Sequence, residues 1–272
     1  MLLAIVTGCV ILFRSAIGEL ISLALRDDRY TSTIAIPLIS FGLIWLERKS
    51  IFADVRYSPL AGAMLPLCFV RSHYDLSIRI LALVMLLVAL FTCFYGLKAA
   101  RRAAFPLLFL FLMVPIPTAV LDRVVATLQK GSADVAHQLF RIAGVPVFRD
   151  ATFKFSLPGI TIQVAQECSG IRSSVSLFIS SLVAGYMLLK SGWSRTFLAL
   201  ASIPIVILKN AVRIVTISLL SVYVDPGFMY GRLHHQGGLV FAVLALGMLG
   251  PVLLLLMKME QAGSREHVTA IA

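Results

Sequence analysis

Long apolar runs, separated by short polar segments, dominate the pattern along this chain. A membrane-spanning helix needs about 20 predominantly apolar residues. Arg14 and Glu19 interrupt the first run, and the third has the length of a re-entrant segment, so the number of spans carries a margin of one or two. We expect about eight helices, over residues 3–24, 33–47, 58–70, 78–97, 103–121, 171–189, 196–222 and 238–257.

The longest polar stretch, residues 122–170, has two internal patterns. Its first part, "DRVVATLQKGSADVAHQLFRIAG", carries apolar residues at helical spacing and ends at Gly144, a suitable C-cap. This pattern predicts an amphipathic helix, whose apolar positions are Val124, Val125, Leu128, Val135, Leu139 and Ile142.

The second pattern, "TFKFSLPGITIQV", alternates apolar and polar positions on both sides of Pro158-Gly159. Alternation around such a dipeptide is typical of a β-hairpin with a tight turn. The apolar positions are Phe153, Phe155, Leu157, Ile160, Ile162 and Val164. The hairpin therefore leads the chain directly to Cys168.

Composition makes the membrane assignment firm, because 59% of the 272 residues are hydrophobic and only 14% are charged. We expect one all-α polytopic membrane domain over residues 1–272.

Lys and Arg outnumber Asp and Glu by 24 to 13. In a membrane protein such an excess fixes orientation and does not require nucleic acid as a partner. The basic segments "LERKS", "LKAARRAA", "LKSGWSR" and the C-terminal tail predict that both termini face the cytoplasm and that residues 122–170 face outward.

Cys168 is the cysteine with polar neighbours, whereas Cys9, Cys68 and Cys93 lie within apolar runs. Ser169 or Gly170 can cap a helix that begins near Ile171. The thiol would then lie at the positive end of the helix dipole, a setting that favours the reactive thiolate. The alternative is a buried cysteine that acts only as a small apolar residue.

Three polar residues interrupt the span "IPIVILKNAVRIVTISLL": Lys209, Asn210 and Arg213. Charged groups inside a bilayer are costly and often functional. Arg213 follows the basic "WSR" by 18 residues, about 27 Å along a helix, which places it near the outer face at the depth of Cys168. Asn210 and Arg213 share a helical face. A structural arginine that pairs with carbonyl groups is the alternative.

Two histidines, His234 and His235, precede the last predicted span in "GRLHHQGGLVF". Loop histidines are often only solvated, but an imidazole near a thiol is the usual proton-transfer partner of a nucleophilic cysteine. Three separate segments thus bring a thiol, a guanidinium and an imidazole to one depth. The pattern favours cysteine chemistry, with neither a metal nor a cofactor.

The same segments carry a resemblance. "PLLFLFLMVPIP", "AGVPVFRD", "LPGITIQVAQECSGIRSS", "NAVRIVTISLL" and "HHQGGLVF" together resemble the bacterial exosortases of the exosortase/archaeosortase family, from about Tyr30 to residue 257. The resemblance implies a cysteine peptidase or transpeptidase of the bacterial inner membrane. Such an enzyme cleaves C-terminal sorting signals of the PEP-CTERM type on exported proteins and is thought to transfer them to an acceptor.

Carried over by position, the resemblance implies that Cys168 is the nucleophile, that Arg213 is the arginine of Asn-x-x-Arg, and that His234 is the catalytic histidine. His235, Arg172 and Asn210 are secondary candidates. Many relatives have a histidine near Thr33, which this chain lacks. The expected mechanism is attack by the thiolate to form an acyl-thioester, on the extracytoplasmic side.

Two other classes of protein fit part of the pattern. In a transporter, Lys209, Arg213 and Arg172 would line an anion path, but the sequence shows neither the inverted repeats nor the paired broken helices typical of that class. In a non-catalytic escort protein, the same groove would hold exported chains without chemistry. The partners expected for the enzyme are exported proteins, membrane lipids and an acceptor nucleophile of unknown identity.

Overall fold

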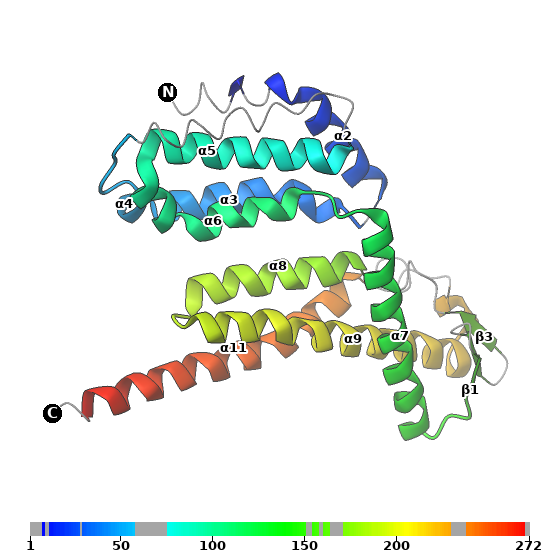
Figure 1. The fold of residues 1–272 in the computed structure, drawn as a ribbon. Coiled ribbons are helices and arrows are strands. Elements are labelled where there is room, and N and C mark those ends of the chain that lie inside the picture. Colours follow the sequence, from blue (N-terminus) through cyan, green and yellow to red (C-terminus); the bar gives the residue numbers. More distant parts are fainter. Residues whose placement is uncertain are drawn as a thin grey trace. The chain divides into compact units, whose positions relative to one another are not determined.

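A computed structural model describes residues 7–8, 11–27, 29–57, 75–150, 154–157, 160–163, 171–229 and 238–269 of the 272. The chain divides into two compact units, Met1–Thr118 and Ala119–Ala272. Helices make up most of the described residues, as Figure 1 shows. Whether the whole chain is one domain stays a prediction.

The described elements of the first unit are all helices. Its apolar interior includes Ile51, Ala99 and Leu107, and the rings of Phe52, Phe91 and Tyr95 pack against one another beside them. The elements are α2 (Arg14–Arg26), η1 (Thr31–Ile34), α3 (Ala35–Leu46), α4 (Arg48–Ile51), α5 (Leu76–Arg102), α6 (Ala104–Phe109) and η3 (Leu110–Met113).

Polar contacts join helices of this unit that are far apart in sequence. The Ser40 hydroxyl donates to the carbonyl of Pro106 at 2.8 Å, and Tyr30 donates to the carbonyl of Ile116 at 3.0 Å. Glu19 forms an ion pair with Arg79, which gives the charged residue of the first apolar run a partner on α5. Thr33 is buried and donates to the carbonyl of Tyr30 at 2.6 Å, so its hydroxyl serves the local fold.

A glycine bends the longest helix of this unit. Gly96 has φ +84°, a conformation that side chains other than glycine rarely adopt. A Cβ atom added there would lie 2.0 Å from the carbonyl oxygen of Arg56. The backbone N–H of Arg56 donates to the carbonyl of Tyr95 at 3.3 Å, so the bend lets the segment before residue 57 pack on α5.

The predicted helix over residues 103–121 is wrong. The helical segment Ala104–Met113 ends before Val114, and α7 begins only at Thr118. Pro115 and Pro117 explain the break, because proline lacks an N–H donor and disfavours helical backbone at the residue before it. Residues 118–121, the predicted end of this span, therefore form the start of α7.

The described part of the second unit contains four long helices and a small sheet. Its elements are α7 (Thr118–Ile142), β1 (Phe148–Arg149), β2 (Lys154–Leu157), β3 (Ile160–Gln163), α8 (Ile171–Leu188), α9 (Gly192–Tyr223), η5 (Pro226–Met229) and α11 (Gly238–Thr269). Helices α8 and α9 form an antiparallel pair, and α11 packs against both through Ala245, Leu249 and Leu256. The Glu260 carboxylate of α11 accepts the backbone N–H groups of Lys190 and Ser191, both at 2.9 Å, at the turn between α8 and α9.

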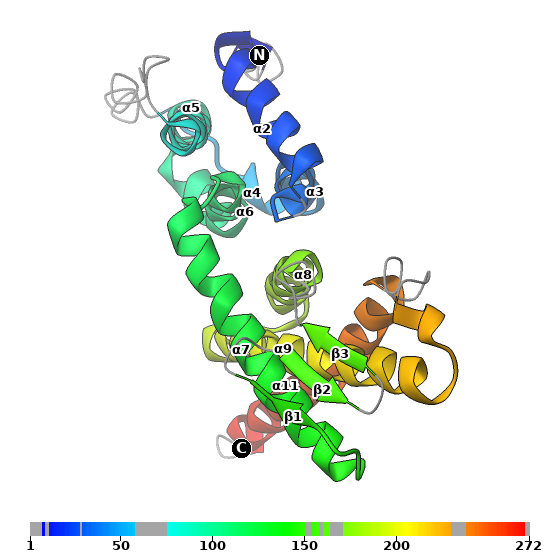
Figure 2. The ribbon, with the colours of Figure 1, turned by 90° about the vertical axis from the view of Figure 1, so that its right-hand side faces the viewer.

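Helix α7 crosses α8 and α9 instead of running along them, as Figures 1 and 2 both show. Small residues allow the close approach: Ala133 and Ala136 are fully buried, and a Cβ atom at Gly131 would lie 3.2 Å from a methyl group of Ile207. On α9, the residues packed in the same cluster are Ala211, Ile214 and Val215.

The predicted amphipathic helix is confirmed, but part of its apolar face is not. Val124 is 45% exposed and Ile142 is 82% exposed, whereas Val125 is buried. The buried face is instead centred on Ala133, Ala136 and Phe140. A helix that packs across another helix needs small side chains at the crossing, and a pattern read from large aliphatic residues overlooks them.

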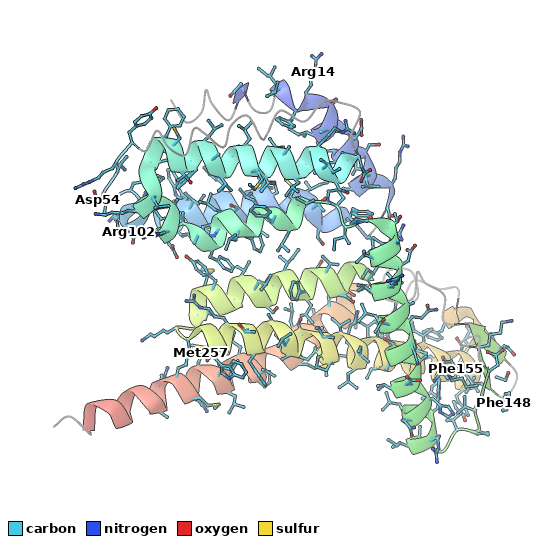
Figure 3. The ribbon with its side chains drawn as sticks, viewed as in Figure 1. Arg14, Asp54, Arg102, Phe148, Phe155 and Met257 are labelled. Carbon is cyan, nitrogen blue, oxygen red and sulfur yellow. The ribbon has the colours of Figure 1, made fainter. Side chains whose placement is uncertain are left out.

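The predicted hairpin is also confirmed. Strands β2 and β3 pair antiparallel with Leu157 opposite Ile160, which leaves the predicted two-residue turn at 158–159, itself outside the described residues. Strand β1 adds a third strand on the other side of β2. Phe155 is buried against Phe140 of α7, while Phe148 lies at the outer edge of the sheet and is 72% exposed (Figure 3). Gly144, with φ +70°, ends α7 as predicted.

Among the described residues, three helices are long and apolar enough to cross a membrane: Leu76–Arg102, Gly192–Tyr223 and Val240–Gly263. The number rises to four if Ala104–Met113 and Thr118–Ile142 are counted together as one broken span. Thr31–Leu46 and Ser173–Leu188 are shorter apolar helices, and the predicted run at 58–70 lies outside the described residues. A membrane protein is confirmed, but eight spans are not.

Candidate functional site

The predicted site residues divide into two groups. Cys168, His234 and His235 lie outside the described residues, as does the side chain of Arg172 in the first turn of α8. Asn210 and Arg213 are described, and both lie on α9 where the sequence placed a helix. The geometry of the site is therefore built from α9 and from the elements that adjoin it.

Lys209 is the charged residue most deeply buried on α9, with 1% of its surface exposed. Its ammonium donates a hydrogen bond to the Ser173 hydroxyl at 2.5 Å. Ser173 belongs to the first turn of α8, which begins at Ile171. Arg213, one helical turn after Lys209, is half-buried. Two cations thus lie one turn apart on α9, and the first of them meets the start of α8.

Asn210 adds an unusual polar group beside this pair. The residue is fully buried, and neither its amide oxygen nor its amide nitrogen has a hydrogen-bond partner within the described parts of the chain. A buried amide without partners costs about 1–3 kcal/mol relative to a satisfied one. Buried polar groups without partners are rare in folded proteins, so this one calls for an explanation. This observation is consistent with the prediction that the Asn210–Arg213 segment has a functional role.

Ser173 is the residue of this cluster that the sequence reasoning missed. It lies in "GIRSSVSLF", where nothing in the local sequence distinguishes this serine from the other small polar residues in the first turns of an apolar helix. Its importance comes from Lys209, which is 36 residues away. The signal available in the sequence was indirect, because a lysine inside an apolar span requires a polar partner on a neighbouring helix.

The polar cluster lies at the start of α8, which meets α9 in the middle part of that helix. Lys209 follows Gly192 by 17 residues, about 26 Å along α9, while Glu260 fixes the opposite end through its bonds to Lys190 and Ser191. The beginning of α11, at Gly238, lies at the same end as the beginning of α8 (Figure 1). The described elements that adjoin Cys168 and His234 in sequence, α8 and α11, therefore start at the same end, where Ser173 contacts Lys209.

No group of three or more His, Cys, Asp or Glu side chains that could hold a metal ion occurs among the residues with described positions. The polar groups that do meet at the cluster are an ammonium, a hydroxyl, an amide and a guanidinium. These groups donate hydrogen bonds or carry positive charge, so the cluster is suited to bind carbonyl oxygens or anions.

Fold and cluster together define a membrane protein with a cationic, hydrogen-bonding site at one end of an apolar helix pair. The chain belongs to the transmembrane exosortase family: the family model described as transmembrane exosortase (Exosortase_EpsH) matches residues 24–250. Searches of curated proteins and of solved structures gave no match. Family membership supports a sorting enzyme in general terms and a location in the membrane.

Proposed function

We propose that this protein cleaves C-terminal sorting signals of the PEP-CTERM type on exported proteins and transfers the new C-terminus to an acceptor nucleophile. The catalytic residues are Cys168, Arg213 and His234, and no cofactor takes part. Two findings support the proposal: membership of the exosortase family, and the cationic cluster that α9 forms with the first turn of α8.

The hydrogen bond between Lys209 and Ser173 is the observation that carries the proposal. It holds the first turn of α8 level with Lys209, and Arg213 lies only about 6 Å further along α9. Cys168 precedes Ile171 by three residues, which an extended chain covers in at most about 11 Å. Covalent geometry thus limits the distance of Cys168 from the start of α8, which supports the proposal that the thiol and Arg213 act on the same substrate.

The proposed reaction begins when the Cys168 thiolate attacks the carbonyl carbon of the scissile peptide bond. A carbon–sulfur bond forms and the carbonyl oxygen becomes an oxyanion, which the Arg213 guanidinium stabilises. The carbon–nitrogen bond then breaks, and protonated His234 gives its proton to the leaving amine. The product of this half-reaction is an acyl-thioester on Cys168.

The second half-reaction releases the sorted protein. Neutral His234 takes a proton from the acceptor nucleophile, which attacks the thioester carbonyl. The carbon–sulfur bond breaks and the thiolate is restored. If the nucleophile is water the result is hydrolysis, and if it is an amine or a hydroxyl the result is transfer. Arginine is suited to charge stabilisation because it does not release its proton at physiological pH.

The proposal includes an orientation. The enzyme would reside in the bacterial inner membrane with both termini in the cytoplasm, and with the cluster facing the extracytoplasmic side where exported substrates arrive. A reporter that is active only outside the cytoplasm should then work when fused near residue 130 or 228 and fail near residue 192. The reverse result would place the cluster on the cytoplasmic side, where exported substrates could not reach it.

The experiment that tests the function uses a co-expressed substrate with a C-terminal sorting signal. Cys168→Ala should insert and fold normally but leave the substrate at its full length. Arg213→Lys should also lose most processing, because lysine keeps the charge but lacks the planar donor fork. Cys93→Ala is the matched control, since Cys93 is a buried thiol of α5, and it should retain processing. Normal processing by Cys168→Ala would refute the proposal.

A further inference from the structure

The outward face of α7 carries three cations in line. Arg123, Lys130 and Arg141 are all exposed. At 100° per residue, Lys130 and Arg141 lie within about 20° of Arg123 around the helix axis. Within the described residues, none of the three pairs with a carboxylate. Asp134 lies on the same face, about 20° from Arg123 around the axis, and its carboxylate is paired with Arg149 at 2.6 Å.

Apolar side chains lie along one edge of this row. Val120 and Val124 are exposed near the start of α7, and Ile142 is exposed at its end. These side chains lie about 60–100° around the axis from the three cations. No described residue of the second unit buries them, because the packed face of α7 is the opposite one, around Ala133 and Ala136. A row of cations beside an apolar edge is typical of a helix that lies in a membrane interface.

The position of α7 along α9 supports the same conclusion. The contacts of α7 with α9 include Gly131 against Ile207 and the apolar cluster with Ala211 and Val215. These residues are 15 to 23 positions after Gly192, or about 22–35 Å along the helix. The hydrocarbon core of a bilayer is about 30 Å thick. If α9 starts at one membrane surface, α7 therefore crosses it at the level of the other.

The end of the row also borders a hollow. His137 and Arg141 line a shallow depression together with Gly144, Val145, Pro146 and Val147. Both side chains can donate hydrogen bonds, and Arg141 is matched to the oxygen atoms of a phosphate.

We propose that α7 is an interfacial helix whose Arg123, Lys130 and Arg141 bind the phosphate groups of anionic phospholipids. The occupant is a lipid headgroup because the same face offers an apolar edge for acyl chains, which a soluble anion does not use. The proposal is independent of the catalytic role of Cys168. It assigns a membrane contact to the helix that also supports the hairpin before the site.

The test places a tryptophan reporter on this edge of the full chain. Ile142→Trp is made together with Trp45→Phe and Trp193→Phe, which removes both natural tryptophans. The protein is reconstituted in nanodiscs that contain dibrominated phosphatidylglycerol or dibrominated phosphatidylcholine at equal fractions. We expect the anionic lipid to quench the reporter about threefold more strongly, because each exposed cation enriches anionic lipid next to it.

Two further variants complete the design. Adding Arg123→Gln, Lys130→Gln and Arg141→Gln should make the two lipids quench equally, while Lys154→Gln, an exposed cation on β2, should leave the preference unchanged. Three results would overturn the proposal: no quenching by either lipid, equal quenching by both before the cations are removed, or a preference that survives their removal. If neither lipid quenches the reporter, and an added polypeptide substrate shields it, the face is assigned to that partner instead.

Discussion

The Lys209 ammonium donates a hydrogen bond to the Ser173 hydroxyl at 2.5 Å, and this bond joins α9 to the first turn of α8. The lysine is almost wholly removed from solvent. A buried ammonium depends on the few partners that the fold provides, because the loss of a partner leaves its charge uncompensated. The contributions of the two residues to stability are therefore coupled, although the residues are 36 positions apart in sequence.

Ser173→Ala should destabilise the protein by about 1–3 kcal/mol, because it removes a partner of a buried charge. The same change should cost much less in a Lys209→Met background, where no charge remains to be satisfied. Thermal unfolding of the four proteins in detergent gives the coupling directly. Ser180→Ala, on an exposed position of α8, is the control and should have little effect. Equal losses in both backgrounds would mean that the bond contributes nothing.

Gly96→Ala should be one of the most damaging small changes in the first unit. The residue has φ +84°, and the new Cβ atom would meet the Arg56 carbonyl oxygen at 2.0 Å. We expect a loss of at least about 2 kcal/mol, since backbone strain and a steric clash act together. Gly42→Ala is the control: it lies inside α3 with no atom within 4 Å of the added Cβ, and it should leave the melting temperature equal or higher. A similar loss in both variants would contradict the strain argument.

The Asp27 carboxylate provides a prediction about pH. Arg29 donates to it from both its backbone N–H and its guanidinium, and these bonds lower the pKa of Asp27 below the ordinary value of 3.8. Because the pKa in the folded state is the lower one, the stabilisation is complete above pH 3.8 and disappears as the pH falls through the folded value.

Asp27→Asn should therefore be less stable than the parent near neutral pH, and the difference should shrink as the medium is acidified below the ordinary pKa. Arg29→Gln should behave in the same way, since it removes the partner that lowers the pKa. Melting temperatures recorded across an acid series test both variants. A difference that grows on acidification would show that the sign of this argument is wrong.

The sequence predicts local features of the second unit well. The pairing of Leu157 with Ile160 fits the hairpin predicted around Pro158-Gly159, and α7 ends at Ile142, just before the predicted C-cap Gly144. Each of these features depends on residues adjacent in sequence. The break after Met113 was also encoded locally, by Pro115 and Pro117, but the apolar run around them outweighed that signal.

Features that depend on contacts distant in sequence were harder to predict. Ser173 gains its role only when α9 brings Lys209 beside it, and Ala136 becomes a core residue only because α7 crosses α9. Of the candidate site, the helical position of Asn210 and Arg213 was predictable. The full burial of Asn210 without partners was not, because burial depends on the neighbouring helices.

The two adjacent histidines should differ in function. His234 has the spacing to Gly238 that the family resemblance favours, and side chains of successive residues point about 100° apart if helical geometry already applies before α11. His234→Ala should lower substrate processing by about 100-fold or more, as expected for a general acid–base group. His235→Ala should retain most activity. Loss confined to His235→Ala would move the catalytic role by one residue, and equal losses would reject the geometric argument.

Covalent capture of the substrate on Cys168 tests the enzyme assignment most directly. Purified protein is incubated with a peptide that carries a C-terminal sorting signal, quenched in acid, digested and analysed by mass spectrometry. The account predicts that the N-terminal part of the substrate is joined to the fragment containing Cys168, that hydroxylamine releases it, and that Cys168→Ala shows no adduct. Cleavage of the substrate by the Cys168→Ala protein, with no adduct in the parent, would contradict catalysis by this cysteine.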